Sequence, residues 1–224
     1  LFVSKFHYGA RVPMTTVGAP MVHDTIPVLN KKSYLFNDHF EERISGKPLN
    51  PPPSHNWWPF AQKNNAEFGG TTKFSHTYPE RMWPKLAGNE TQEVPHKGIR
   101  FNYGDFDDVI DLMVKEPFTR QAFLPIWFPE DTGGANGERV PCTIGYHFIR
   151  RHNYLHVVYY IRSCDFFRHF RDDIYLACRK VIWALEKLRE KDPDLWNDVK
   201  PGMYTMHITS LHAFKQEKML LKKK

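Results

Sequence analysis

The stretch that decides the fold runs from residue 142 to residue 191 and reads CTIGYHFIRRHNYLHVVYYIRSCDFFRHFRDDIYLACRKVIWALEKLREK. Residues Cys142–Ile149 and Tyr154–Ile161 are rich in aromatic and β-branched side chains, which predicts two strands joined by a polar turn at 150–153. From about Asp172 to Glu190 apolar side chains recur at helical spacing, which predicts a long helix. Two strands that lead into one long helix, with no regular strand–helix–strand alternation around them, predict an α+β fold.

Shorter elements are predicted on both sides of this stretch. Helical spacing appears at about residues 33–44 and at Phe106–Val114. Ala122–Phe128 has the apolar and aromatic character of a buried strand, and Tyr204–Phe214 is predicted as a final strand. The first 100 residues otherwise have the Pro-rich, irregular pattern of loops.

The length fits one domain, or at most two small ones, and the resemblance described below implies a single catalytic domain over residues 1–224. The chain is 41% hydrophobic, which is enough apolar material for a sizeable core. No apolar run approaches the roughly 18 residues that span a bilayer, so no membrane partner is predicted. The three cysteines are an odd number without CxxC spacing, which argues against a disulfide framework and favours a reducing, cytoplasmic setting.

The charge balance is basic, but only weakly so. Lys and Arg number 31 against 25 Asp and Glu, and the tail Lys222–Lys224 supplies half of the net charge of +6. The remaining basic residues are interspersed with acidic ones, which is typical of a solvated mixed surface and does not favour nucleic-acid binding. A basic chain also suits a small phosphorylated substrate. The 12 histidines show no metal-ligand spacing, so no metal is predicted.

One cysteine and one charged corner are candidates for chemistry. Cys142 by itself is more often a small buried side chain than a nucleophile, although Arg139 and Arg162 are cations that would lower its pKa. The corner that begins Arg162-Ser163-Cys164-Asp165 and ends at Asp173 is dense in charge. Its charges suit either helix capping or the binding of an anion at a helix N-terminus.

Seven short motifs in order resemble the thymidylate synthase superfamily. That family's landmarks run DPxSRR, WNP, PCH, RSxD, PFN, PG and GDxHIY. The corresponding segments in this chain are Glu116-Pro117-Phe118-Thr119-Arg120, Trp127-Phe128-Pro129, Pro141-Cys142-Thr143, Arg162-Ser163-Cys164-Asp165, Phe170-Arg171-Asp172-Asp173, Pro201-Gly202 and Ser210-Leu211-His212-Ala213-Phe214. The resemblance covers residues 116–214. It implies a mixed β-sheet packed with helices, with one sheet face forming a dimer interface.

Two departures resemble the deoxycytidylate hydroxymethylases, a branch of that superfamily. Asp173 stands where the synthases have an asparagine that contacts the pyrimidine edge, and Thr143 replaces the histidine after the nucleophile. A carboxylate accepts hydrogen bonds from the 4-amino group of cytosine and from a protonated N3. The O4 acceptor of uracil would face the same carboxylate without a donor, which is costly in a site short of water. Asp173 therefore predicts a cytosine nucleotide as substrate.

The resemblance implies a folate-dependent transferase. Cys142 would add to C6 of dCMP or CMP, and C5 would then take a one-carbon unit from 5,10-methylenetetrahydrofolate. Hydration would give a 5-hydroxymethyl product, while Asp173 stabilises the charge on the base. The deoxynucleotide is favoured because position 163 keeps the serine that is usual in this family at the phosphate and sugar end of the site. A glutamate on an early helix would relay protons. It falls at Glu42, with Glu41 as the fallback, and both also fit solvated helix charges.

The remaining site residues are implied in the same way. Arg162 and Ser163 would bind the 5′-phosphate, and Arg120 would reach the phosphate in the partner subunit of a homodimer. Gln121 replaces a second arginine there. His212 would bond the ribose, beside Phe214 in place of a tyrosine. Asp165 would support the folate. Arg11 would contact the phosphate, and Trp83 and either Trp57 or Trp58 would lie at the folate.

Two alternatives remain open. One is a methylating synthase that acts on dUMP or dCMP and forms dihydrofolate. The other is a non-catalytic nucleotide- or nucleic-acid-binding relative, which the departures at Gln121, His147 and Phe214 favour. The intact Cys142 and the Arg162-Ser163-x-Asp165 pattern argue against that second alternative.

Overall fold

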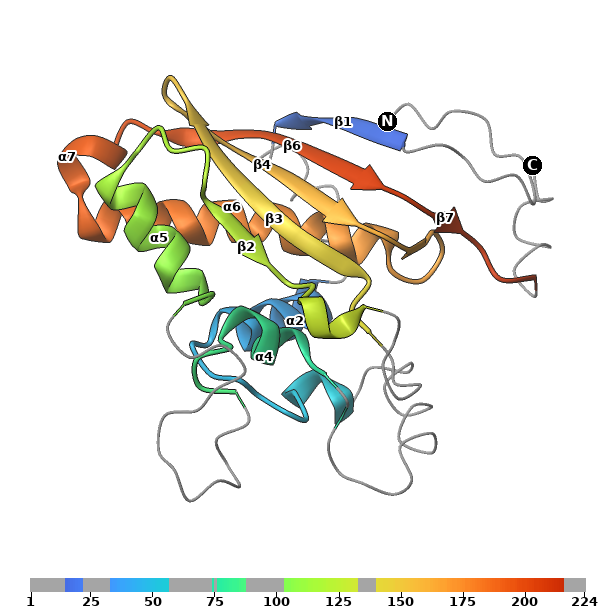
Figure 1. Ribbon diagram of the computed structural model, residues 1–224. Coiled ribbons are helices and arrows are strands. Elements are labelled where there is room, and N and C mark those ends of the chain that lie inside the picture. Colours follow the sequence, from blue (N-terminus) through green and yellow to red (C-terminus); the bar gives the residue numbers. More distant parts are fainter. Residues whose placement is uncertain are drawn as a thin grey trace, which may run out of the picture. The chain divides into compact units, whose positions relative to one another are not determined.

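A computed structural model describes residues 15–21, 33–56, 74, 76–87, 103–132 and 140–215 (Figure 1). The described residues fall into two compact units. One unit holds 15–21 and 142–215, and the other holds the described residues from 33 to 141. A single catalytic domain over residues 1–224 stays a prediction.

The first unit is built on a mixed sheet. Its strands are β1 (Thr15–Met21), β3 (Thr143–Arg151), β4 (Tyr154–Ile161) and β6 (Lys200–Ile208), and they lie in the order β1-β6-β4-β3. The pairs β3–β4 and β1–β6 are antiparallel, whereas β4 and β6 run parallel. Helices pack with this sheet, so the predicted α+β fold with a mixed sheet is confirmed.

The core of this unit lies between one sheet face and a long helix. Along β4 the alternate residues Leu155, Val157, Tyr159 and Ile161 are buried, as the period of two in a strand requires. The helix α6 (Phe170–Lys191) runs along that face and buries an apolar stripe that includes Val181 and Leu185 (Figure 1). A short helix, α7 (Pro193–Trp196), follows it.

Both strands and the helix predicted from residues 142–191 are confirmed. The turn between the strands is shorter than predicted, because β3 and β4 extend until only His152 and Asn153 join them. His152 has φ 51°, in the left-handed region that tight hairpin turns need. The prediction that the first 100 residues are irregular is wrong at β1. The sequence of β1, TTVGAPM, lacks a strand-like alternation, but the segment pairs along β6.

The predicted final strand Tyr204–Phe214 is wrong in its bounds. β6 begins earlier, at Lys200, and ends at Ile208, and a separate strand β7 (Leu211–His212) follows. Pro201 is tolerated because it lies beyond Met203, where the pairing with β1 ends, so its missing N–H interrupts no bond to that strand. β7 leaves the main sheet and pairs in parallel with β5 (Cys164–Asp165).

Gly202 allows a close approach between β6 and β4. A Cβ atom there would lie 2.7 Å from His156 Nδ1 and 2.9 Å from the carbonyl oxygen of Leu155. The same His156 Nδ1 accepts a hydrogen bond of 2.9 Å from the backbone N–H of Met203. Any side chain at position 202 would therefore push the two strands apart.

The second unit is mostly helical. Its elements are α2 (Ser33–Ile44), the 3-10 turn η2 (Pro53–Asn56), α4 (Tyr78–Met82), α5 (Phe106–Lys115), β2 (Phe123–Pro125) and the 3-10 turn η4 (Pro129–Asp131). The helices predicted at 33–44 and Phe106–Val114 are confirmed. The strand predicted over Ala122–Phe128 is present but confined to β2.

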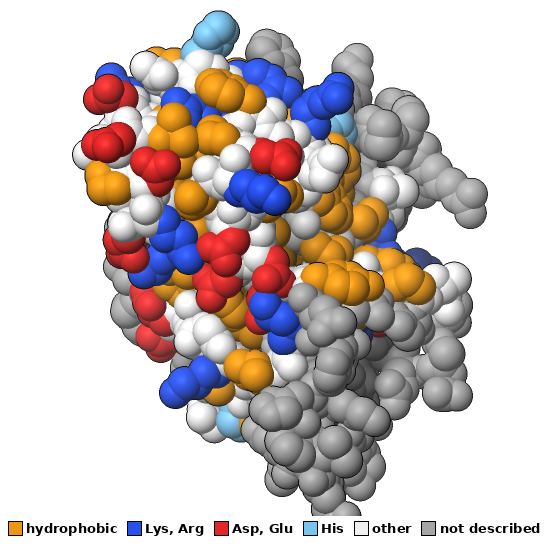
Figure 2. Space-filling model, turned by 60° about the vertical axis from the view of Figure 1, so that its left-hand side comes forward, with side chains coloured by type: hydrophobic (Ala, Val, Ile, Leu, Met, Phe, Trp, Pro, Cys, Tyr) orange, Lys and Arg blue, Asp and Glu red, His pale blue; other side chains and the backbone are white. Residues whose placement is uncertain are grey.

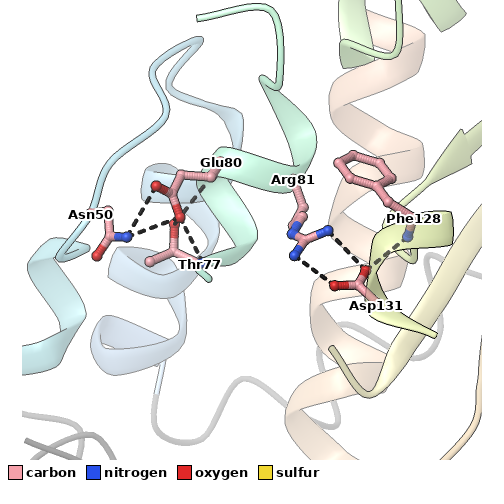
Figure 3. A network of polar contacts seen from close by, with 6 residues as sticks. All are labelled: Asn50, Thr77, Glu80, Arg81, Phe128 and Asp131. Carbon is pink, nitrogen blue, oxygen red and sulfur yellow. Dashed lines mark hydrogen bonds and ion pairs between the residues drawn. The ribbon is translucent and has the colours of Figure 1, made fainter. Parts of the chain in front are cut away.

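A buried ion pair links α4 to η4 in this unit. Arg81 donates two hydrogen bonds of 2.9 Å to the Asp131 carboxylate, which also accepts the backbone N–H of Phe128 at 2.8 Å (Figure 3). The Arg81 guanidinium also stacks 4.7 Å from the centre of the Phe128 ring. Nearby, Glu80 accepts hydrogen bonds from Asn50 and from the backbone of Thr77, which ties the start of α4 to the segment after α2.

Basic and acidic side chains are interspersed over the described part of the face drawn in Figure 2. Within the described residues, no helix combines the length and the apolar composition that a membrane crossing requires.

Candidate active site

The polar corner between β4 and α6 places Arg162 against Cys142. The backbone N–H of Arg162 donates to the carbonyl oxygen of Cys142 at 2.9 Å, so the start of β3 and the end of β4 are joined there. Cys142 is half-buried, whereas Cys164 and Cys178 are buried, and none of the three forms a disulfide. Cys142 is thus the cysteine that a ligand can reach from solvent.

Cys164 contacts the predicted base-binding residue. Its Sγ donates to Asp173 Oδ2 at 3.8 Å, a distance at which a thiol makes a weak hydrogen bond. Burial raises the pKa of the Cys164 thiol far above its usual range, and the neighbouring Asp173 and Cys142 raise it further. Cys164 therefore stays protonated and acts as a donor toward Asp173, while Cys142 is the better candidate for a nucleophile.

Asp173 lies in the first turns of α6, half-buried, with its backbone N–H bonded to the carbonyl oxygen of His169 at 2.8 Å. The fully buried hydroxyl of Tyr204, on β6, has no hydrogen-bond partner among the described residues. Burial raises the pKa of Tyr204, and Cys178 and the Asp173 carboxylate raise it further. Asp173 thus accepts a hydrogen bond from the protonated Cys164 thiol. It also lies within electrostatic range of the protonated Tyr204 phenol.

The small sheet of β5 and β7 brings Ser163 and His212 together. Asp165 pairs with His212 in this sheet, and the N–H of Phe166 donates to the carbonyl oxygen of His212 at 2.9 Å. Ser163 Oγ then lies 3.5 Å from His212 Nδ1. The two residues implied to bind the phosphate and the sugar are 49 positions apart in sequence and adjacent in the fold.

The Asp165 side chain stabilises the turn that follows β5. Its side chain is 5% exposed, and Oδ1 accepts the backbone N–H groups of Phe167 and Arg168 at 3.1 and 3.2 Å. Oδ2 lies 3.4 Å from Arg168 Nε. The Arg168 guanidinium stacks 4.3 Å from the centre of the Phe214 ring, which meets the His212 ring edge-on at 5.6 Å. Asp165 thereby holds Arg168 against the Phe214 ring, which in turn contacts His212.

In the second unit, Glu42 is the buried member of the two candidate glutamates. It is 6% exposed, whereas Glu41 faces solvent. Its two carboxylate oxygens accept hydrogen bonds from the N–H and the hydroxyl of Ser54, at 3.0 and 2.8 Å. His39 Nε2 lies 3.9 Å from Glu42 Oε1. Burial raises the pKa of Glu42 above its ordinary value, against the opposing effect of the Ser54 hydrogen bonds.

The other predicted residues divide between described and undescribed parts of the chain. Trp83 is 3% exposed, and its Nε1–H donates to the carbonyl oxygen of Arg43 at 2.9 Å, so its ring lies inside the second unit. Arg120 is exposed, as a residue that reaches another subunit would be. Arg11, Trp57 and Trp58 lie outside the described residues.

Three residues at these sites were not predicted as functional. Cys164 lies inside a recognised motif, and its burial beside Asp173 is a tertiary feature. Ser54 follows three prolines and has no motif that would connect it with Glu42. Arg168 belongs to a charge-dense corner, but only the fold brings it to Phe214.

The first unit brings several reactive and charged side chains to this corner of the fold. It has a half-buried thiol, a carboxylate beside a thiol donor, a hydroxyl–imidazole pair and arginine side chains. Among the described residues, no three His, Cys, Asp or Glu side chains form a group that would hold a metal ion. Such a corner combines a candidate nucleophile with hydrogen-bonding and cationic groups.

Solved structures identify the fold. The crystal structure of thymidylate synthase from T4 phage matches with a TM-score of 0.64, and the match covers 95% of this chain and 72% of that chain. This chain has the thymidylate synthase fold. The identity is 19%, so the likeness establishes the fold and leaves the reaction to be argued from the residues. No protein-family model and no curated protein sequence matches the chain.

Proposed function

We propose that this protein transfers a one-carbon unit from 5,10-methylenetetrahydrofolate to C5 of a cytosine nucleotide 5′-monophosphate, preferably dCMP, and hydrates it to the 5-hydroxymethyl nucleotide. The observation that carries the proposal is the corner where the backbone N–H of Arg162 donates to the carbonyl oxygen of Cys142 and where the Cys164 thiol donates to Asp173. In this proposal Cys142 is the nucleophile and Asp173 is the carboxylate that binds the base.

The reaction begins with covalent addition. The Cys142 thiolate adds to C6, and the electron pair of the C5–C6 double bond becomes available at C5. C5 then attacks the methylene carbon of the folate, the C5 proton is lost to a base, and tetrahydrofolate leaves. Water adds to the exocyclic methylene, and elimination of the thiolate restores the double bond. The folate leaves unoxidised, so no dihydrofolate forms.

Asp173 is proposed to select cytosine. Its carboxylate accepts from the 4-amino group and from protonated N3, and it stabilises the positive charge that develops on the ring. The Cys164 thiol, kept protonated by burial, donates to Oδ2 and so restrains the carboxylate. Uracil would place its O4 acceptor against Asp173 with no donor between them.

The remaining residues have binding roles in this proposal. Arg162 and Ser163 bind the phosphate with Arg11, and His212 bonds the sugar beside Phe214. On the folate side, Asp165 acts by fixing the 165–168 turn, and Trp83, Trp57 and Trp58 are candidate contacts. Glu42 relays protons and orders water, a role that its burial and raised pKa support.

We also propose a homodimer that uses the second face of the sheet. On that face β4 and β6 present half-exposed His156, Val158, Tyr160, Thr205 and His207, in alternation with the buried core residues. A face of such mixed character suits an isologous interface. Arg120, exposed in the second unit, would supply a phosphate contact to the partner subunit.

Tritium release tests the reaction and the choice of base together. The protein is incubated with methylenetetrahydrofolate and 5-tritiated dCMP, CMP or dUMP, and the products are identified by mass. Tritium release from a cytosine nucleotide, a hydroxymethyl product and no dihydrofolate are expected. Asp173→Asn should shift the preference toward dUMP by at least about tenfold, because an amide matches the edge of uracil. Asp173→Asn protein that still prefers cytosine would show that this residue does not select the base.

The covalent step has its own test. Cys142→Ser should abolish turnover and leave nucleotide binding within about twofold, because a serine hydroxyl is a far weaker nucleophile than a thiolate. Cys178→Ser, at a buried cysteine outside the corner, serves as the matched control and should keep turnover. Turnover by the Cys142→Ser protein would rule out the covalent mechanism.

The alternatives give different results in the same assays. Release from dUMP with dihydrofolate formed indicates a methylating synthase. Binding of nucleotides with no tritium release indicates a non-catalytic relative, the alternative that Gln121, His147 and Phe214 favour.

A further inference from the structure

Arg168 is held between Asp165 and the Phe214 ring, and that ring meets His212 edge-on. Its backbone N–H and its Nε both contact the buried Asp165 carboxylate, at 3.2 and 3.4 Å. Its guanidinium stacks 4.3 Å from the centre of the Phe214 ring. An arginine held by a buried carboxylate on one side and an aromatic face on another has lost most of its rotamer freedom, so it can bind a ligand with little further ordering.

Phe214 offers a surface without a hydrogen-bonding group. The ring is 43% exposed and meets His212 edge-on with 5.6 Å between centres. Nucleotide sugars carry hydroxyl groups that need hydrogen-bond partners once water is excluded. Beside His212, the phenyl ring supplies none, whereas the guanidinium stacked on it is a hydrogen-bond donor.

We infer that Arg168 is a further substrate-binding residue and that it donates to the sugar hydroxyls of the nucleotide, next to His212. This inference rests on the proposed function, because His212 and Ser163 are assigned to the sugar and the phosphate there. Phe214 acts as the platform that positions the guanidinium, and Asp165 acts as its anchor. Asp165 and Arg168, in one turn, and the distant Phe214 thus form one sugar-binding element.

The test measures the dissociation constants of dCMP and of 2′,3′-dideoxycytidine monophosphate by calorimetry, without folate. Arg168→Leu should weaken dCMP binding by about tenfold, the size expected for one charge-assisted hydrogen bond. It should leave binding of the dideoxy analogue nearly unchanged, because that ligand has no sugar hydroxyl to lose. A purely structural role would weaken both ligands alike.

Two further variants sharpen the result. Arg171→Leu removes an exposed arginine from the first turn of α6, the helix that follows the 165–168 turn, and should change binding by less than about twofold. Phe214→Tyr places a phenolic donor beside His212, so it should recover part of the dCMP affinity in the Arg168→Leu background. Thermal unfolding checks each protein, and Arg168→Gln replaces Arg168→Leu should the latter fail to fold.

The outcomes separate the inference from the proposed function. If Arg168→Leu weakens the binding of dCMP and of the dideoxy analogue equally, or weakens neither, the inference is overturned and the proposed function is not. An effect confined to the KM of methylenetetrahydrofolate also overturns it and would assign Arg168 to the folate. Absence of any cytidine nucleotide binding by the wild-type protein overturns the proposed function and the inference with it.

Discussion

Glu42 shows at the scale of one residue how burial sets the pH dependence of stability. Burial raises its pKa above the ordinary 4.5, so the folded protein holds the proton more tightly than the unfolded chain. The corresponding stabilisation is complete below pH 4.5 and is lost as the pH rises through the higher folded value. Glu42→Gln should therefore show a shallower fall in the free energy of unfolding than the wild-type protein does, over a pH series that rises from 4.5.

The exposed neighbour provides the control for this prediction. Glu41→Gln, measured by urea denaturation across the same pH range, should follow the wild-type curve, because Glu41 faces solvent. Glu80 and Asp105 also have raised pKa values, so Glu42→Gln removes only part of the slope. Parallel curves for Glu42→Gln and the wild type would mean that Glu42 is ionised without cost in the folded state.

At the scale of secondary-structure elements, the Arg81–Asp131 pair decides how α4 and η4 are joined (Figure 3). Asp131→Asn removes the charge that faces a buried guanidinium and should lower the free energy of unfolding by about 3–5 kcal/mol. Glu190→Gln breaks the exposed Lys187–Glu190 pair, whose atoms are 2.7 Å apart, and should cost less than about 1 kcal/mol. Equal effects of the two substitutions in urea denaturation would show that burial does not make the loss of the Asp131 charge more costly.

At the scale of the whole molecule, the proposed dimer predicts complementation between subunits. Arg120→Ala and Cys142→Ser each remove one part of every site in their homodimers. A hybrid dimer keeps one site that has both Cys142 and the partner's Arg120. Co-expression with two affinity tags should therefore restore turnover to about a quarter of the wild-type value in a random mixture of dimers.

The mass in solution and the unmixed variants complete this test. Light scattering should give twice the 26.5 kDa of one chain. Mixed variants that show no more turnover than Arg120→Ala protein would mean that Arg120 acts within its own subunit or not at all.

The sequence by itself determined the elements whose pattern is local. The strands around 143–161, the helix that begins near Asp173 and the helices at 33–44 and 106–115 all follow from side-chain periodicity, because each repeats its pattern over two or more turns or pleats. The order of short motifs also anticipated the thymidylate synthase fold. Cys142, Arg162 and Asp173 were named from that order.

Only the tertiary structure decided the features that depend on distant pairing. β1 forms because β6 offers it a partner, and the run after Pro201 splits because Leu211 and His212 pair with β5 instead of the main sheet. The burial of Glu42 rather than Glu41, and the stacking of Arg168 on Phe214, have the same origin. Hydrogen bonds and burial between residues that are distant in sequence leave no periodicity in the chain, so the local pattern cannot reveal them.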